Sequence, residues 1–240
     1  MVRLFLVILF FSSQSLSKIA IPSGLSSSDR EKVVSILGSG TSLRLLSDPY
    51  PLGGYPGLEF GFSANVLNTS ELSRLGQRTA SQSETTMTSF SIAKGLYQNV
   101  DVEFDFAPFE QSDGVSYYGA QMRWGFSQSK SLPLYWSLAL LGSSTAFQNV
   151  LNVNNQELLL SAAYRQSDVS LLLGAGSLRS QGQFVGGVGG ITDSGLLERS
   201  SLEKIHYLAG VNIDFSQLFL ALEMDQYFQL SYSAKFGVRL

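Results

Sequence analysis

The sequence predicts an all-β protein, a ten-stranded antiparallel barrel that crosses a membrane with its strands. Ten segments alternate strictly between apolar and polar residues. Each segment has about 9 to 11 residues, the length of a tilted membrane strand. The connections between them alternate between long and short, as in transmembrane barrels. Two other architectures stay open, namely a barrel of eight strands and a soluble β-sandwich that turns the apolar faces inward.

The composition limits the classes of chemistry that the chain can perform. Its 240 residues are 15% charged and 12% aromatic, with 23 Gly, which suits strands and tight turns better than a charged soluble surface. Without Cys, the chain has no disulfide, no Cys-ligated zinc and no thiol nucleophile. The single His, His206, leaves little room for a metal cluster, so we expect no metal and no cofactor. The net charge of −3 gives no basic excess for nucleic acid, so we expect no nucleic-acid partner.

The first 17 residues have the pattern of a signal peptide. Arg3 supplies a positive start and an unbroken apolar run follows from Leu4 to Phe11. Ser15 and Ser17 are the small residues expected before a cleavage site at Lys18. The apolar run is shorter than the roughly 20 residues that span a bilayer, so a retained anchor is the weaker alternative.

Residues 18–56 form a region of their own, with one short amphipathic helix and an irregular lead-in. Ser28–Glu31 has the S-x-x-E spacing of a capping box, and Gly38 suits the exit from the helix. Ser47–Gly57 then has three Pro and three Gly. This region is either an ordered periplasmic extension or a plug at a barrel mouth.

Residues 57–240 form the predicted transmembrane barrel. The strongest alternation is in Val100–Phe106, where Val and Phe oppose Asp and Glu. The ten expected strands run near Leu58–Val66, Thr86–Gly95, Asn99–Phe106, Tyr118–Phe126, Pro133–Gly142, Glu157–Arg165, Val169–Ser177, Ile205–Phe215, Leu218–Asp225 and Gln229–Leu240.

The rhythm of the connections predicts the orientation. Four expected connections are long and follow odd strands: Asn68–Glu84, Ala107–Gly114, Ser143–Asn155 and Leu178–Leu202. The connections after even strands are short, and only the last odd one, near Gln226–Phe228, breaks the rule. Long loops face outward in barrels of this kind, so an even strand count puts both chain ends on the periplasmic side.

Aromatic residues near strand ends favour a membrane barrel over a sandwich, because two aromatic girdles mark the two interfaces of a bilayer. Lys94 is the one charge on an apolar face, and its place at a periplasmic strand end lets it snorkel to water. The girdle candidates at the periplasmic end are Trp124, Phe126, Trp136, Tyr164 and Phe215, and those at the outer end are Phe106, Tyr118, Tyr207 and Tyr232.

The chain ends on the alternating strand Tyr232–Leu240, which must pair with the first strand to close the barrel. Arg239 and Glu59 would then both lie low in the lumen beside that seam. With its signal peptide, strands, loop rhythm and final amphipathic strand, the chain resembles the bacterial outer-membrane β-barrel family. The resemblance implies an outer-membrane location in a Gram-negative cell and reading of the last strand by the barrel-assembly machinery. Leu240 stands where the family usually has Phe.

The polar faces of the strands supply the candidate lumen residues. A ten-stranded barrel is too narrow for a wide channel, so we expect a mostly filled polar lumen. The charges form either a structural ion-pair network or an acidic outer mouth that attracts cations. The candidate lumen charges are Glu59, Asp101, Glu103, Asp105, Arg123, Glu157, Arg165, His206, Asp214, Glu223, Lys235 and Arg239.

The expected role is structural, adhesive or that of a narrow, porin-like pore at the cell surface, with outer-membrane lipids and an unidentified surface ligand or small ions as partners. The competing class is an outer-membrane enzyme, a protease or a lipid-modifying protein, with its site at the outer rim near His206. No residue is assigned as catalytic. Phe184–Gly195 is Gly-rich but has no G-K-S/T, and it lies between strands, so we expect an outer loop there and no phosphate site.

Overall fold

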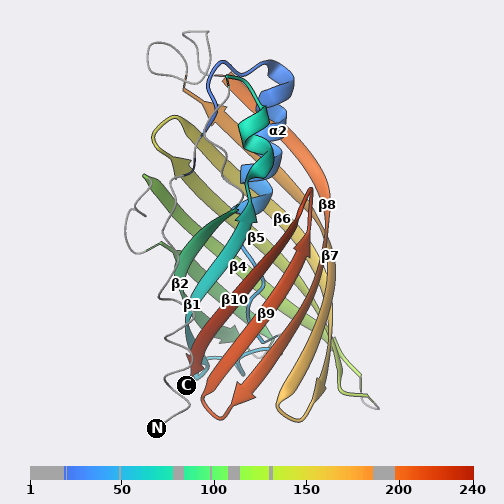
Figure 1. Cartoon of the computed structure of the whole chain (residues 1–240). Coiled ribbons are helices and arrows are strands. Elements are labelled where there is room, and N and C mark those ends of the chain that lie inside the picture. Colours follow the sequence, from blue (N-terminus) through green and yellow to red (C-terminus); the bar gives the residue numbers. More distant parts are fainter. Residues whose placement is uncertain are drawn as a thin grey trace.

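The computed structural model shows a closed antiparallel barrel of ten strands (Figure 1). It describes residues 19, 21–48, 50–77, 84–97, 99–107, 114–129, 132–185 and 198–240. The predicted signal peptide and most of the Gly-rich stretch after Phe184 lie outside these ranges. The strands are β1 (Leu58–Asn68), β2 (Glu84–Tyr97), β3 (Val100–Phe106), β4 (Val115–Gln128), β5 (Leu134–Phe147), β6 (Leu151–Gln166), β7 (Val169–Phe184), β8 (Glu198–Phe215), β9 (Leu218–Gln226) and β10 (Leu230–Arg239).

Ten strands at the ten predicted places confirm the predicted fold class and exclude the eight-stranded alternative. Four strands, β5 to β8, run further toward the outer end than the sequence analysis predicted. The expected loop at residues 143–155 is wrong, because strand continues to Phe147 and resumes at Leu151. Gln148 and Asn149 have φ of 49° and 58°, the left-handed conformation of a tight hairpin turn. Much of the expected loop at 178–202 is likewise strand. In these parts of the strands the outward residues are polar. The apolar pattern in the sequence therefore ends before the backbone hydrogen bonds of the strands do.

The last strand closes the barrel as predicted. β10 pairs with β1 in a register that sets Arg239 opposite Glu59 and Tyr232 opposite Val66. This pairing removes both sheet edges, which a strand barrel in hydrocarbon requires.

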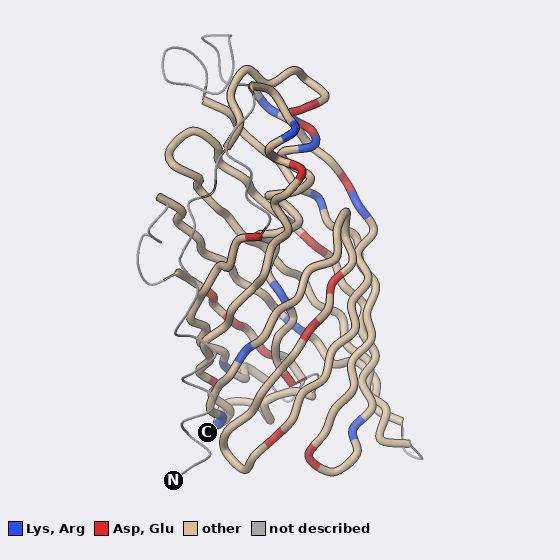
Figure 2. Tube along the Cα trace, viewed as in Figure 1, with Lys and Arg blue, Asp and Glu red and all other residues tan. Residues whose placement is uncertain are grey.

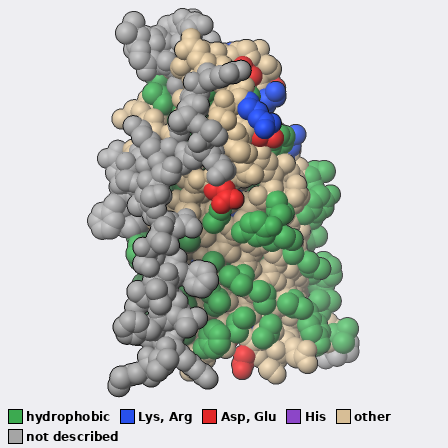
Figure 3. Space-filling view, viewed as in Figure 1, with side chains coloured by type: hydrophobic (Ala, Val, Ile, Leu, Met, Phe, Trp, Pro, Cys, Tyr) green, Lys and Arg blue, Asp and Glu red, His purple; other side chains and the backbone are tan. Residues whose placement is uncertain are grey.

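The strand faces have the polarity of a membrane barrel. Leu173 and Tyr118 point outward with 65% and 66% of their surfaces exposed, whereas Lys235 points inward and is 1% exposed. Figure 3 shows hydrophobic side chains gathered over the lower part of one face, with charged and other polar side chains above them. A soluble sandwich would bury the first set and expose the second, so the structure excludes that alternative. An exterior of this kind is stable in a bilayer, so the chain is a transmembrane β-barrel protein, as the sequence predicts.

The helix α2 (Ser27–Gly40) begins and ends differently from the prediction. Its N-cap is Ser26, whose Oγ accepts a hydrogen bond from the Asp29 N–H (3.2 Å), so the capping box predicted at Ser28 is wrong. The helix continues past Gly38 because the Thr41 N–H donates to the carbonyls of Leu37 and Gly38. Its polarity runs along its length: the charged first half is largely exposed, and residues 33–40 are all buried.

This N-terminal region lies inside the barrel rather than in the periplasm. We call residues 33–48 the lumen segment; every one of them is buried. The Asn155 amide on β6 donates to the Gly38 carbonyl (3.0 Å), and the Ser143 hydroxyl on β5 donates to the Thr41 carbonyl (3.0 Å). Further down, the Tyr50 hydroxyl donates to the carbonyl of Pro133 in a periplasmic turn (2.7 Å). The segment thus descends the lumen from the outer end to the start of β1 (Figure 1).

The two described ends of the chain therefore lie at opposite ends of the barrel. Gln148, in the outer β5–β6 turn, donates to the carbonyl of Ile19 (2.9 Å). The Gln77 N–H, in the outer β1–β2 connection, donates to the carbonyl of Ser23 (2.8 Å). The prediction that both ends lie on the periplasmic side is right for β10 and wrong for the region before β1. The strand count fixes where β1 starts, but it does not fix the path of the chain that precedes it.

An apolar core closes the outer end. The buried half of α2 packs against upper residues of β1, β6, β7 and β8. The short 3-10 helix η1 (Ser70–Arg74) adds Leu72 to the same core. Among the buried residues of this core are Ile19, Leu25, Val33, Val34, Leu37, Leu67, Leu75, Val115, Phe147, Leu151 and Phe184.

Candidate functional site in the barrel lumen

Two groups of charged side chains hold the lumen segment, one around Arg44 and one around Asp48. Figure 2 shows charged residues on the strands along much of the barrel. The upper charge cluster comprises Arg44, Glu157, His206, Glu223 and Asp225. The lower charge cluster comprises Asp48, Glu59, Asp101, Glu103, Arg123, Arg165, Asp214, Lys235 and Arg239.

Arg44 is the cation of the lumen segment in the upper charge cluster. Its guanidinium donates to the Ser231 hydroxyl (3.0 Å) and to the Ser39 carbonyl (3.1 Å), and its Nε lies 3.6 Å from a carboxylate oxygen of Asp225. The next backbone N–H, of Leu45, donates to Glu223 Oε1 (3.2 Å). The segment is therefore bound to β9 and β10 by both side chain and backbone.

His206 lies between two carboxylates and is 2% exposed. Its Nε2 is 2.8 Å from Asp225 Oδ1, and its Nδ1 contacts Glu157 Oε1. The His206 ring stacks on the Tyr227 ring with a centroid distance of 3.7 Å. The Arg44 guanidinium also lies over the Tyr227 ring, 4.8 Å from its centroid. An imidazole donates from both nitrogens only as the imidazolium, so this arrangement suits a charged His206. Both nitrogens are occupied and the ring is buried, so this geometry lends nothing to the rim-enzyme alternative.

Asp48 joins the lumen segment to opposite walls of the barrel in the lower charge cluster. Its carboxylate contacts Arg165 of β6 and lies 3.4 Å from Arg239 of β10. Asp214 of β8 contacts the same two arginines, 2.6 Å from Arg165. The Asp48 carbonyl accepts a hydrogen bond from Arg123. One residue of the segment thus binds three arginines from three strands.

The rest of the lower charge cluster ties the closing seam together. Lys235 Nζ lies 2.8 Å from Glu59 Oε1 and 2.7 Å from Glu103 Oε1. Arg239 Nε lies 2.8 Å from the other oxygen of Glu59, as the predicted proximity to the seam requires. Arg123 and Asp101 pair at 3.0 Å. Buried charges of this kind are stable only when each has its partner.

Glycines on the inward faces make room for side chains that cross the lumen. A Cβ on Gly61 would lie 2.2 Å from Cε of Lys235, and one on Gly125 would overlap the ring of Tyr135. The Gly-rich polar faces noted in the sequence thus belong to a filled narrow tube.

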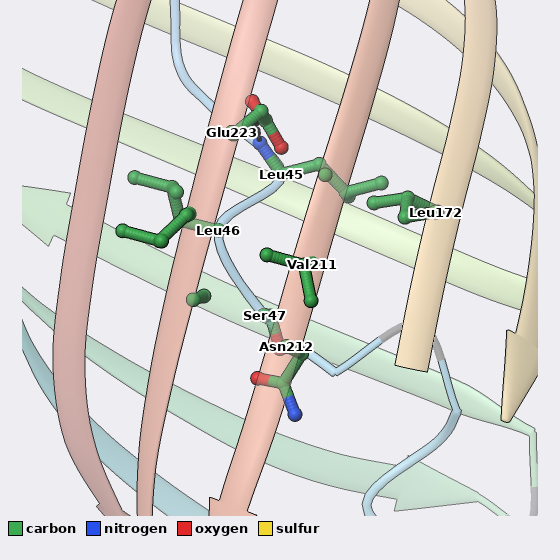
Figure 4. Close-up of a pocket in the computed structure, with 10 residues that line it drawn as sticks. Leu45, Leu46, Ser47, Leu172, Val211, Asn212 and Glu223 are labelled. Carbon is green, nitrogen blue, oxygen red and sulfur yellow. Dashed lines mark hydrogen bonds between the residues drawn. The ribbon is translucent and has the colours of Figure 1, made fainter. Parts of the chain in front are cut away.

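Little space is left around the segment. The gap beside Leu45–Ser47 has a volume of about 10 Å³, and a second gap below it, near Arg123, is of the same size. A buried water needs about this much room. Figure 4 shows the segment running along the strands that carry Val211, Asn212 and Glu223. In the part of the chain that the structure describes, no wide channel crosses this level.

All twelve candidate lumen charges point into the barrel, and most are buried. Arg165, Asp214 and Arg239 are half-buried near the periplasmic end. Asp105 is buried apart from both clusters and accepts a hydrogen bond from the Tyr117 hydroxyl (3.4 Å). The acids expected to form an open acidic mouth lie instead beneath α2 and around Arg44.

The sequence pattern does not single out the residues of the lumen segment as a site. Arg44 and Asp48 were not candidates, and neither was Tyr227. A signal for Arg44 was present, because it is the only charge between Lys32 and Asp48 in a tract of Leu, Ser and Gly. If such a tract is buried, its single arginine is stable only when paired with an acidic residue.

The girdle candidates all lie on the outer surface, with 38% to 66% of their surfaces exposed. Trp124 and Phe126 pack together at a centroid distance of 5.7 Å near the periplasmic end. Lys94 lies there as well, and its amine donates to the carbonyls of Tyr55 and Gly57 (3.4 Å to the latter). The lead-in before β1 thus satisfies the one charge on an apolar face.

Two kinds of feature are absent from the described residues. Within them, no group of three or more His, Cys, Asp or Glu side chains could hold a metal ion. No described helix is both long enough and apolar enough to cross a bilayer.

Comparison with known proteins shows weak likenesses among solved structures. No family model and no curated protein matches the chain. The attachment invasion locus protein Ail of Yersinia pestis is 14% identical, with a TM-score of 0.33, over 77% of this chain and 97% of that one. The KdgM porin is 8% identical, with a TM-score of 0.36, over 76% and 98%. The Escherichia coli outer-membrane protease OmpT is 8% identical, with a TM-score of 0.39, over 77% and 96%. Likenesses at this level carry no activity over to this chain.

Proposed function

We propose that this protein is a closed outer-membrane barrel with a structural or adhesive role at the cell surface, whose own N-terminal segment fills the lumen. The observation that carries the proposal is the complete burial of residues 33–48 inside the strands. A porin-like role would need a continuous polar path. The lumen segment occupies that path.

The contacts of the segment support a permanent closure. Arg44 and Asp48 are both at most 7% exposed in their side chains and bind charges on several strands. Withdrawing the segment would break the ion pairs of Arg44 with Asp225 and of Asp48 with Arg165 and Arg239. These three pairs, together with the apolar contacts of α2, favour the closed state over the open one.

The outer end supports the surface role. On β6 and β7 the outward positions beyond Leu158 are polar, which suits water above the bilayer. They include Asn152, Asn154, Gln156, Arg179 and Gln181, and all five are exposed. This wall rises above the apolar band and carries the charged half of α2 beside it. It offers a folded polar surface for contact with other molecules.

The proposal is tested by conductance in planar bilayers. Wild-type protein is expected to insert without ion current, and a variant lacking residues 19–48 to open steady channels. A second variant, Arg44→Glu with Asp48→Lys, keeps the chain length and opposes the cluster charges; it should open intermittently. Steady ion-selective current through the wild-type protein would contradict the closed barrel and favour the narrow pore. Insertion is checked separately by the change in gel mobility on boiling.

A further inference from the structure

The lipid-facing surface has a hollow of about 770 Å³ across β3 to β8. Its apolar part is lined by outward side chains of β3, β4, β5 and β6. Its upper part is polar. The side chains that define it are Phe104, Met122, Leu140, Leu158, Gln156 and Arg179.

The hollow arises from two small residues side by side. Ala120 of β4 pairs with Gly142 of β5, and the same cross-strand row continues to Phe104 on one side and Gln156 on the other. Large outward side chains surround this low point in the next row, where Met122 pairs with Leu140. The surface is therefore hollowed where neighbouring rows stand high.

The hollow has an apolar lower end and a polar upper end. Phe104 is four residues beyond the periplasmic start of β3 at Val100, whereas Arg179 is ten residues beyond the start of β7 at Val169. Arg179 is exposed and has no hydrogen bond or ion pair with any described residue. Glu203 lies opposite it on β8 and accepts a hydrogen bond from the Ser177 hydroxyl (3.2 Å). Thus the upper end offers a cation, a carboxylate and an amide.

This combination distinguishes between classes of lipid. An unpaired guanidinium at the edge of the apolar band suits a phosphate, which it can bind through two parallel hydrogen bonds. The neighbouring carboxylate of Glu203 repels a simple anion that carries no hydrogen-bond donors. The same carboxylate can accept hydrogen bonds from sugar hydroxyls. The Gln156 amide can donate and accept in the same way. The apolar part suits an acyl chain lying over Ala120 and Gly142.

We propose that the hollow binds a phosphorylated glycolipid of the outer leaflet, of the lipid A class. One acyl chain lies over Gly142, the phosphate is on Arg179, and sugar hydroxyls are on Gln156 and Glu203. The inference rests on the outer-membrane location and is independent of whether the lumen conducts. It adds a specific lipid to the general lipid contact of the barrel.

The test is native mass spectrometry of the purified, folded protein in mild detergent, titrated with lipid A or with phosphatidylglycerol. Wild-type protein should bind one lipid A at least tenfold more tightly than phosphatidylglycerol. Arg179→Gln should weaken lipid A binding about tenfold. Gly142→Leu should abolish it by filling the hollow. A Cβ on Gly142 meets only the Asn155 carbonyl oxygen, at 3.8 Å, so the barrel should accept this change.

The matched control is Arg199→Gln, another exposed arginine on the outward face of the same wall, opposite Gln183 and outside the hollow. It should bind lipid A like the wild type. Equal binding of the two lipids, normal binding by Gly142→Leu, or an equal loss in Arg199→Gln would overturn the proposal. Folding of each variant is checked by gel mobility, and bilayer insertion is scored apart from lipid binding. Failure of the membrane location is thereby distinguished from failure of the lipid site.

Discussion

Lys235 shows at the scale of one residue how a charge is made stable inside this barrel. It crosses above Gly61 to reach Glu59 and Glu103, which come from strands that only barrel closure brings to β10. Glu103 has one other side-chain partner, the amide of Gln121 at 2.7 Å. The ammonium therefore neutralises a carboxylate that has no second cation near it among the described pairs.

We expect Lys235→Met to lower the free energy of unfolding by about 3–5 kcal/mol, because it leaves Glu103 buried without a counter-charge. The measurement is urea unfolding in lipid vesicles, followed by the fluorescence of the chain's two tryptophans, Trp124 and Trp136. Adding Glu103→Gln to Lys235→Met should restore part of the loss. Lys204→Met, at an exposed position, should change little. Unchanged stability in Lys235→Met would show that this ion pair contributes nothing.

For single residues, the sequence predicts which way a charged side chain points but not which partner it binds. The inward direction of the twelve lumen charges follows from period-two alternation, because one polar face of each strand must be enclosed. Their partners do not follow from it. Asp48 binds Arg165 and Arg239 across separations of 117 and 191 residues, and no local pattern encodes such a pairing.

At the scale of elements, the exposed and buried residues of α2 are separated along the helix axis and do not form two faces. Its exposed charges lie in the first turns, where Asp29 also favours the positive end of the helix dipole, and its buried half is small and apolar. A helix with this order suits insertion by its C-terminal end into a narrow lumen. The sequence predicts an amphipathic helix here, but residues 33–40 are buried on every side.

Contact between α2 and β7 is close enough to test with one substitution. A Cβ on Gly182 would lie 2.2 Å from Cγ2 of Val34. We expect Gly182→Val to displace the helix and to raise the rate at which externally added protease cuts within residues 33–48 by about tenfold, since overpacking costs typically 1–3 kcal/mol. Gly142→Val, on the lipid side of β5, is the control and should leave the segment protected. Equal protection in both variants would contradict the packing described for α2.

The strand bounds were predictable where the outward residues are apolar and face lipid. They were less predictable beyond the outer edge of the apolar band. β3 and β9 end within a residue or two of their predicted bounds because their whole length is amphipathic. β6 was expected to start at Glu157 but starts at Leu151, because its first outward residues are Asn152, Asn154 and Gln156. Polar outward faces remove the contrast between loop and strand.

At the scale of the whole molecule, the path of the lumen segment determines which side of the membrane the N-terminal region faces. Ile19 lies by the outer β5–β6 turn, whereas β1 starts at the periplasmic end. Cleavage near Ser17 would therefore leave the new N-terminus at the cell surface.

An epitope inserted between Lys18 and Ile19 should bind antibody on intact cells. The same epitope between Ser216 and Gln217, in the turn that joins β8 and β9, should bind only after the outer membrane is permeabilised. Detection of the first epitope only in permeabilised cells would mean that the segment does not run from the outer end.

In this barrel the apolar strand faces contact hydrocarbon and the polar faces are enclosed. The most direct measurement is spin-label accessibility at consecutive positions of β6, since the absence of Cys makes each introduced thiol unique. Leu158→Cys and Leu160→Cys point outward, and Leu159→Cys and Ser161→Cys point inward. In lipid vesicles, labels at the outward pair should be accessible to oxygen and inaccessible to a polar nickel complex, and labels at the inward pair should be inaccessible to both. Access of the nickel complex to positions 158 and 160 would place that face in water and contradict a membrane barrel.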